Sequence, residues 1–202
     1  MGEPLKRRLR RIGILGGSFN PAHEGHRQIS LEALKRLRLD EVWWLVSPQN
    51  PLKPQAGMAA FQKRIEGAKR VADHPRIKVS DLESRLGSTF TAETLARLAR
   101  RLPRLRFVWL MGADNLAQIA RWNRWTRIFQ TVPIAVFDRP TYSLRALSGR
   151  AARRFARARI KESRAERLAD MAPPAWVFLH TPLNAISATA LRAQGSGPGS
   201  GR

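Results

Sequence analysis

Apolar runs of strand length alternate along this chain with segments of helical periodicity, and this alternation constrains the fold more than any other feature. The apolar runs cover residues 11–15, 41–46, 77–79, 106–111, 132–137 and 176–180. Between them, apolar side chains recur at helical spacing in residues 28–37, 61–71 and 91–102. Strands that alternate with helices form βαβ units, which build a parallel sheet. The sequence therefore predicts an α/β fold with a doubly wound parallel sheet and flanking helices.

The remaining segments lie outside this alternation. Residues 143–171 are rich in Arg and Ala and carry no strand pattern, which favours one or two exposed helices. Residues 1–10 form a basic extension, and the Gly- and Ser-rich residues 195–202 are typical of a disordered tail. We therefore expect a single domain over residues 1–194.

Composition limits the possible functions. The chain of 202 residues contains no cysteine, which excludes disulfides, thiolate metal sites and a cysteine nucleophile. The apolar run near the N-terminus is too short for a signal peptide, and no window is typical of a membrane span. The sequence predicts a cytoplasmic protein that does not associate with membranes.

The net charge of +22 is the most unusual property of the composition. Such a charge attracts polyanions, so it fits a nucleic-acid binder, an enzyme for phosphorylated substrates, or a generally Arg-rich surface. Residues 145–167 and 6–11 are the densest basic segments. Aromatic side chains do not interleave with this charge, so we favour a solvated surface and do not expect a nucleic-acid partner.

Polar and glycine-rich motifs follow the predicted strands. They are GGSFNPAHEGH at 16–26, SPQNPLKP at 47–54, GSTFTAETL at 87–95, MGADNL at 111–116 and ISATALR at 186–192. Parallel strands end at one edge of the sheet, and ligands of such folds bind there, where the strand order reverses. We therefore expect these motifs to meet in one site.

The first motif combines flexible glycines with two histidines. Gly16 and Gly17 allow backbone N–H groups to approach an anion at a helix N-terminus, although a plain tight turn explains the pair equally well. His23 and His26 face the same side of a helix and can donate hydrogen bonds to phosphate oxygens. A metal pair needs further ligands that the neighbouring sequence lacks, and two core histidines at this spacing would be unusual.

The motifs 16–26 and 186–192 together resemble the signatures of the nucleotidylyltransferase superfamily, HxGH and ISSTxxR. The motifs between them resemble those of the bacterial nicotinate-mononucleotide adenylyltransferases. This resemblance implies a Rossmann-like fold and the transfer of AMP from ATP to nicotinate mononucleotide, which yields deamido-NAD and pyrophosphate in NAD biosynthesis. It also implies Mg²⁺ bound with ATP, no metal ligands from protein side chains, and a possible homo-oligomer.

The resemblance assigns roles to individual residues of this chain. The candidate catalytic residues stabilise charge on the triphosphate and are His23, His26, Lys53 and Arg192. The candidate ATP-binding residues are Gly16, Gly17, Ser18, Phe19, Asn20, Gly112, Asp114, Ile186, Ser187 and Thr189. The candidates for the mononucleotide are Asn50, Thr91 and Trp122, and Trp122 would stack on the pyridine ring. A core role for Trp122 is an equally good interpretation.

The chain departs from the family pattern at three places. Asn20 replaces the more common Asp, the NPLKP sequence replaces a histidine-containing PPHK form, and the chain ends soon after the ISATALR motif. Two alternative functions remain open. One is a sister adenylyltransferase for nicotinamide mononucleotide or phosphopantetheine, and the other is a non-catalytic nucleic-acid-binding module.

Overall fold

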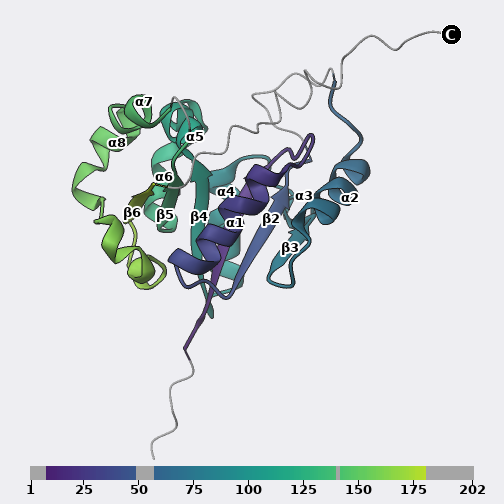
Figure 1. The fold of residues 1–202 in the computed structure, drawn as a ribbon, viewed down its shortest axis with the longest axis horizontal. Coiled ribbons are helices and arrows are strands. Elements are labelled where there is room, and N and C mark those ends of the chain that lie inside the picture. Colours follow the sequence, from purple (N-terminus) through teal and green to yellow (C-terminus); the bar gives the residue numbers. More distant parts are fainter. Residues whose placement is uncertain (1–7, 49–56, 140–141, 181–202) are drawn as a thin grey trace, which may run out of the picture.

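The computed structural model describes residues 8–48, 57–139 and 142–180, and the account below is restricted to them. One parallel sheet contains the strands β1 (Arg10–Gly17), β2 (Glu41–Val46), β3 (Ile77–Ser80), β4 (Leu105–Gly112), β5 (Ile134–Phe137) and β6 (Trp176–Leu179). They lie in the order β3-β2-β1-β4-β5-β6 (Figure 1). The order reverses between β1 and β4, as in a doubly wound sheet. The predicted fold class is therefore confirmed.

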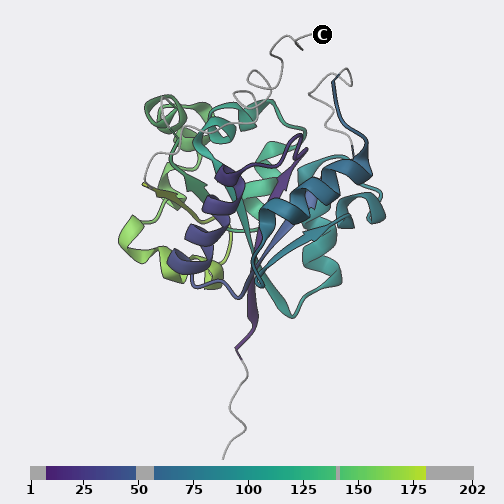
Figure 2. The same cartoon turned by 45° about the vertical axis from the view of Figure 1, so that its right-hand side comes forward.

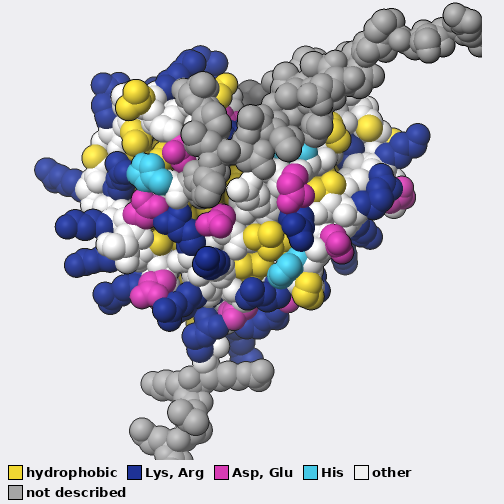
Figure 3. Space-filling model, in the orientation of Figure 1, with side chains coloured by type: hydrophobic (Ala, Val, Ile, Leu, Met, Phe, Trp, Pro, Cys, Tyr) yellow, Lys and Arg dark blue, Asp and Glu magenta, His cyan; other side chains and the backbone are white. Residues whose placement is uncertain are grey.

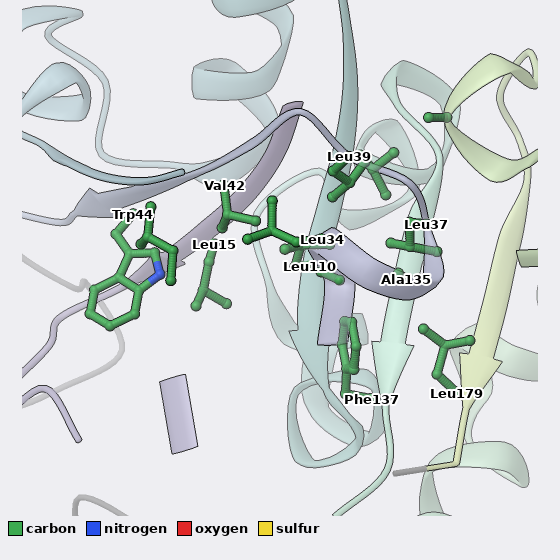
Figure 4. Close-up of a cluster of buried hydrophobic side chains, with 14 of the residues drawn as sticks. Leu15, Leu34, Leu37, Leu39, Val42, Trp44, Leu110, Ala135, Phe137 and Leu179 are labelled. Carbon is green, nitrogen blue, oxygen red and sulfur yellow. The ribbon is translucent and has the colours of Figure 1, made fainter. Parts of the chain in front are cut away.

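Alternate side chains of each strand point to opposite faces of the sheet, and both faces are buried. Within β4, Val108 and Leu110 belong to one apolar cluster, whereas Phe107, Trp109 and Met111 belong to the other. Figure 4 shows the first cluster. A strand buried on both faces reads as a continuous apolar run, which explains why these strands could be recognised in the sequence.

Two helices cover the face with the first cluster. They are α1 (Glu24–Arg36) and α2 (Phe61–Ala72), which lie side by side in front of the sheet in Figure 2. Helix α1 begins at Glu24, four residues earlier than the predicted start at 28. The residue before it, His23, is the N-cap and has an extended backbone (φ −149°, ψ 167°). Gly25 in the first turn of α1 obscures the helical pattern, since glycine is a weak helix former.

The opposite face is covered by α4 (Thr91–Arg101), α5 (Ala113–Gln118) and α6 (Trp125–Thr131), whose buried apolar residues belong to the second cluster. The short α3 (Leu82–Arg85) precedes α4, and the 3-10 helix η1 (Ile119–Arg121) follows α5. The predicted helix at 91–102 is confirmed by α4. Strand β5 starts two residues later than predicted, after Pro133, which lacks a backbone N–H.

The prediction of one or two exposed helices in 143–171 is wrong. The segment contains α7 (Ser143–Leu147), α8 (Arg150–Arg154) and the 3-10 helices η2 (Ala156–Ala158) and η3 (Glu162–Asp170). The alanines of α7, α8 and η3 are buried, with those of α7 and α8 in the second cluster and those of η3 in the first, whereas η2 contains no buried residue. The segment therefore passes from one face of the sheet to the other around the β6 edge.

Among the described residues, no helix has both the length and the apolar character that a membrane span requires.

Candidate active site

A cavity of about 100 Å³ lies where the carboxyl ends of β1, β4 and β5 meet the first turns of α1. This is the place where the strand order reverses. Its lining residues are Leu15, Gly16, His23, Gly25, His26, Gln28, Ile29, Glu32, Gly112, Asp114, Asn115, Asp138 and Arg139. The topology therefore brings together the motif after β1 and the motif after β4, as the sequence predicted.

Contacts with the core restrict the residues at the end of β1 and in the loop that follows it. A Cβ on Gly16 would come within 2.4 Å of Cη2 of Trp109, so the indole ring of β4 requires a glycine there. Phe19 has a left-handed backbone (φ 45°) and is only 2% exposed. Its ring stacks on that of Trp44, with centroids 5.0 Å apart. The Phe19 side chain thus belongs to the core, which leaves its backbone as the part that could contact ATP.

His23 and His26 lie against each other at the N-terminus of α1. Their ring centroids are 3.8 Å apart, and the His23 N–H donates to Nδ1 of His26 at 3.2 Å. Ser30 donates to the His26 carbonyl at 2.8 Å and in turn accepts a hydrogen bond from Nε1 of Trp44 at 2.8 Å. These contacts fix the first turn of α1 on the core. Both imidazoles line the cavity from this fixed turn.

His23 is held neutral at physiological pH. Burial lowers its pKa to about 4, and the positive charge of Arg139 acts in the same direction. The side chain is 5% exposed, and its buried Nδ1 has no hydrogen-bond partner among the described residues. A buried polar atom without a partner is costly, so a ligand or water in the cavity would stabilise it.

Asp114 and Arg139 form the opposite wall of the cavity. Nη1 of Arg139 donates to Oδ2 of Asp114 at 2.7 Å. The other carboxylate oxygen, Oδ1, is buried and has no partner among the described residues. A Cβ on Gly112 would come within 2.4 Å of this oxygen, so Gly112 leaves room for the carboxylate. The cavity thus presents a neutral imidazole, a half-satisfied carboxylate and a guanidinium.

Of the remaining predicted site residues, those that the structure describes do not line the cavity. Asn20 hydrogen-bonds both the Gly57 carbonyl (3.1 Å) and the Ala59 N–H (3.2 Å), and so it links its loop to the start of α2. Thr91 begins α4 and does not line the cavity. Trp122 is partly buried against the second apolar cluster. Outside the described residues lie Asn50, Lys53, Ile186, Ser187, Thr189 and Arg192.

Three polar residues near these loops were missed by the sequence interpretation. Arg139 lines the cavity, and Arg64 and Glu83 are buried, with exposed fractions of 4% and 7%. Arg139 could have been found because it follows β5 as the other motifs follow their strands. Arg64 occupies an ordinary position in an amphipathic helix, and Glu83 stands in a polar stretch, so no sequence pattern marks their burial.

No group of three or more His, Cys, Asp or Glu side chains in the described part of the chain is arranged to hold a metal ion.

Comparison with known proteins shows the family of this chain. The family model described as cytidylyltransferase-like matches residues 14–194. A Bradyrhizobium sp. (strain ORS 278) protein named "Probable nicotinate-nucleotide adenylyltransferase" is 58% identical over 90% of this chain and 95% of its own. A protein of that name from Cereibacter sphaeroides (strain ATCC 17025 / ATH 2.4.3) is 57% identical over 91% of this chain and 97% of its own.

Solved structures show the same fold. The Plasmodium falciparum nicotinic acid mononucleotide adenylyltransferase complexed with NaAD has a TM-score of 0.68 and 18% identity, covering 91% of this chain and 83% of its own. A putative nicotinate-nucleotide adenylyltransferase from Vibrio parahaemolyticus has a TM-score of 0.52 and 22% identity, covering 63% and 77%. The chain belongs to the cytidylyltransferase-like family and, within it, to the nicotinate-nucleotide adenylyltransferases.

Proposed function

We propose that this protein transfers the adenylyl group of ATP to the phosphate of nicotinate mononucleotide, producing deamido-NAD and pyrophosphate. The names of relatives that cover nearly the whole chain support the reaction. The structural observation that carries the proposal is the cavity at the strand-order reversal, where His23 and Asp114 each hold a buried polar atom that has no partner within the described part of the chain. Those atoms need a polar ligand, and a nucleotide supplies one.

The reaction needs positioning and charge stabilisation more than a protein nucleophile. A phosphate oxygen of the mononucleotide attacks the α-phosphorus of ATP and forms a new P–O bond. The bond between the α-phosphorus and the bridging oxygen breaks, and pyrophosphate leaves with the electron pair. No net proton transfer is required of the protein, so a neutral His23 is suited to donating an N–H to a phosphate oxygen.

The other predicted residues complete this proposal. His26 would donate a second hydrogen bond, since its Nδ1 accepts from the His23 backbone and Nε2 carries the proton. Lys53 and Arg192 would neutralise the triphosphate, and Ser187, Thr189 and Ile186 would bind it through hydroxyl and backbone groups. Mg²⁺ would enter bound to ATP and neutralise charge on its phosphates. Asn50, Thr91 and Trp122 would hold the mononucleotide.

A pyrophosphate-release assay tests the proposal. Purified protein, ATP and Mg²⁺ are combined separately with nicotinate mononucleotide, nicotinamide mononucleotide and phosphopantetheine. We expect the highest kcat/KM with nicotinate mononucleotide. A higher value with either of the other acceptors would assign the protein to a sister activity, and the absence of release with all three would overturn adenylyl transfer.

A further inference from the structure

Several buried polar groups lie outside the cavity and have no part in the chemistry proposed above. Arg64, Glu83, Ser88 and Thr94 are each less than 10% exposed. Burying a charged group is unfavourable unless hydrogen bonds compensate for lost hydration. The partners of these groups therefore show what their burial achieves.

Arg64 extends from α2, and every hydrogen bond that its guanidinium makes within the described residues goes to a backbone carbonyl oxygen. Its Nη1 donates to the carbonyls of Ser18 and Ser47, each at 2.7 Å. Its Nη2 donates to the carbonyl of Pro48 at 2.9 Å, and Nε donates to that of Ala59 at 3.0 Å. No carboxylate pairs with Arg64 within the described residues. One guanidinium thus joins the loop after β1, the loop after β2 and the segment that leads into α2.

Glu83 lies in α3 and binds hydroxyl groups from two directions. The Ser47 side chain and Oγ1 of Thr94 (3.4 Å) both hydrogen-bond its carboxylate. Thr94 is also 2.7 Å from Oγ of Ser88. If Ser88 donates to Thr94 and Thr94 donates to Glu83, the hydroxyl protons of Ser88 and Thr94 both have an acceptor in this series of hydrogen bonds. Glu83 thereby connects the loop after β2 to residues 88–94, which form the turn before α4 and its first helical turn.

Ser47 is the residue at which these two networks meet. Its N–H donates to the Gly17 carbonyl at 2.9 Å, its carbonyl accepts from Arg64, and its side chain hydrogen-bonds Glu83. Three different atoms of one residue are therefore fixed by three different segments. A displacement of Ser47 must be transmitted to all of them.

We propose that Arg64 and Glu83 are positioning residues that act through Ser47 to hold residues 17–18, residues 47–48 and the turn before α4 as one rigid unit, the Ser47 clamp. None of the hydrogen bonds that Arg64 and Glu83 make within the described residues involves a cavity histidine or Asp114. The clamp sets the relative positions of residues 17–18, beside the proposed phosphate site, and of Thr91, beside the proposed mononucleotide site. In this respect it rests on the proposed function, and it predicts that the two substrate sites are energetically coupled.

Steady-state kinetics of Arg64→Met, Glu83→Gln and the double variant test the clamp. We expect Arg64→Met to raise KM for ATP and for nicotinate mononucleotide about tenfold, because misplaced loops bind both substrates less well. Glu83→Gln should raise KM for the mononucleotide by about three- to tenfold. Because both residues act through Ser47, the double variant should change KM by clearly less than the product of the single changes. The proposal would be overturned if the double variant changed KM by the full product of the single changes, or if the single variants left KM unchanged.

Matched controls separate positioning from general stability. Arg70→Met removes an exposed arginine from the helix that carries Arg64. Glu66→Gln replaces an exposed glutamate by glutamine, the same change of residue type as in Glu83→Gln. Both controls should keep wild-type KM values. Arg64→Lys retains the charge but cannot reproduce the guanidinium geometry, so it should still raise both KM values. If Arg64→Met does not fold, Arg64→Lys replaces it in these measurements.

Amide hydrogen exchange supplies a readout that needs no substrate. Arg64→Met should speed exchange in residues 87–91, and Glu83→Gln should speed it in residues 17–19, because each variant loosens the distant loop through Ser47. Faster exchange confined to each variant's own loop would overturn the clamp. If the wild-type protein fails to use nicotinate mononucleotide, the proposed function fails while these exchange data still decide the clamp.

Discussion

At the scale of single residues, the surroundings of each histidine decide what it can do. His23 and His26 share one face of α1, but the structure adds burial, the nearby charge of Arg139 and contact with the core. A histidine with a pKa of about 4 is neutral at pH 7 and offers both a donor and an acceptor. This environment favours hydrogen bonding to phosphate over proton transfer near neutral pH.

His23→Ala should lower kcat about 10²- to 10³-fold, the typical effect of removing one donor that stabilises developing charge. Circular dichroism and Tm should show that the variant still folds. His74, which accepts a hydrogen bond from the Arg76 N–H in the turn before β3, provides the control. His74→Ala should retain wild-type turnover. Full activity of His23→Ala would exclude its proposed role.

Two buried groups should give opposite dependences of stability on pH. For His23, the folded pKa of about 4 lies below the ordinary pKa of 6.5, so the unfolded chain binds more protons and the free energy of unfolding falls as pH drops from 6.5 towards 4. For Glu83, burial raises the pKa from 4.5 to about 7, so the free energy of unfolding falls as pH rises from 4.5 to 7.

Glu83→Gln removes the contribution of Glu83 to the pH dependence of the free energy of unfolding. Urea unfolding between about pH 4.5 and 6.5 should show a steeper rise of stability with pH in this variant than in the wild type. The difference in slope should approach, at most, about 1.4 kcal/mol per pH unit. Glu66→Gln, at an exposed site, should leave the wild-type slope unchanged. Equal slopes in the wild type and Glu83→Gln would mean that Glu83 has an ordinary pKa.

At the scale of elements, the segment from the end of η1 to the start of α6 carries two tryptophans with different surroundings. Trp125 starts α6 and packs edge-on against Phe129 and Phe155, with centroid distances of 6.2 and 5.9 Å. Trp122 precedes α6 and contacts the same apolar cluster, but no aromatic stacking partner is recorded for it among the described residues. Trp125 is therefore held against the apolar cluster by two aromatic contacts, whereas stacking of Trp122 on a pyridine ring stays a prediction.

Alanine at each position separates the two roles. Trp125→Ala should lower the free energy of unfolding by about 3 kcal/mol, because it empties part of the core, and should leave KM unchanged. Trp122→Ala should raise KM for nicotinate mononucleotide about tenfold with a smaller loss of stability. Chemical denaturation and steady-state kinetics on both variants provide the comparison. A loss of stability alone in Trp122→Ala would assign this residue to the core.

At the scale of the whole molecule, the excess of positive charge dominates. Lys and Arg side chains project around the face shown in Figure 3, with acidic side chains between them. The pair Arg38–Glu166 (2.7 Å) is exposed on both sides and therefore weak, and in the pair Arg10–Glu41 (2.7 Å) the arginine is exposed. A net charge of +22 leaves most of the basic side chains repelling one another.

Raising the salt concentration should therefore stabilise the fold. Tm should increase by several degrees between about 0.02 M and 0.3 M NaCl, because screening weakens long-range repulsion more than contacts at hydrogen-bond distance. Choline chloride at equal ionic strength should have the same effect, since screening does not depend on the cation. A decrease of Tm with salt would show that the surface ion pairs outweigh the repulsion.

The sequence by itself determined the sheet, because strands buried on both faces must be apolar along their length, and the order of strands and helices permits few topologies. It also placed His23, His26, Gly112 and Asp114 in one site, since they follow strands that end at the same edge. It did not indicate the path of residues 143–171, because alternating Arg and Ala are compatible with either exposed or half-buried helices.

Only the tertiary structure decided which polar groups are buried and what they contact. The ring of Phe19 proved to be a core side chain, and Arg64 and Glu83 proved to bind different atoms of Ser47. Their contacts join segments that are distant in the sequence, and burial depends on how those segments pack. Local patterns encode the periodicity of an element, but they do not encode the partner that packing brings to a given side chain.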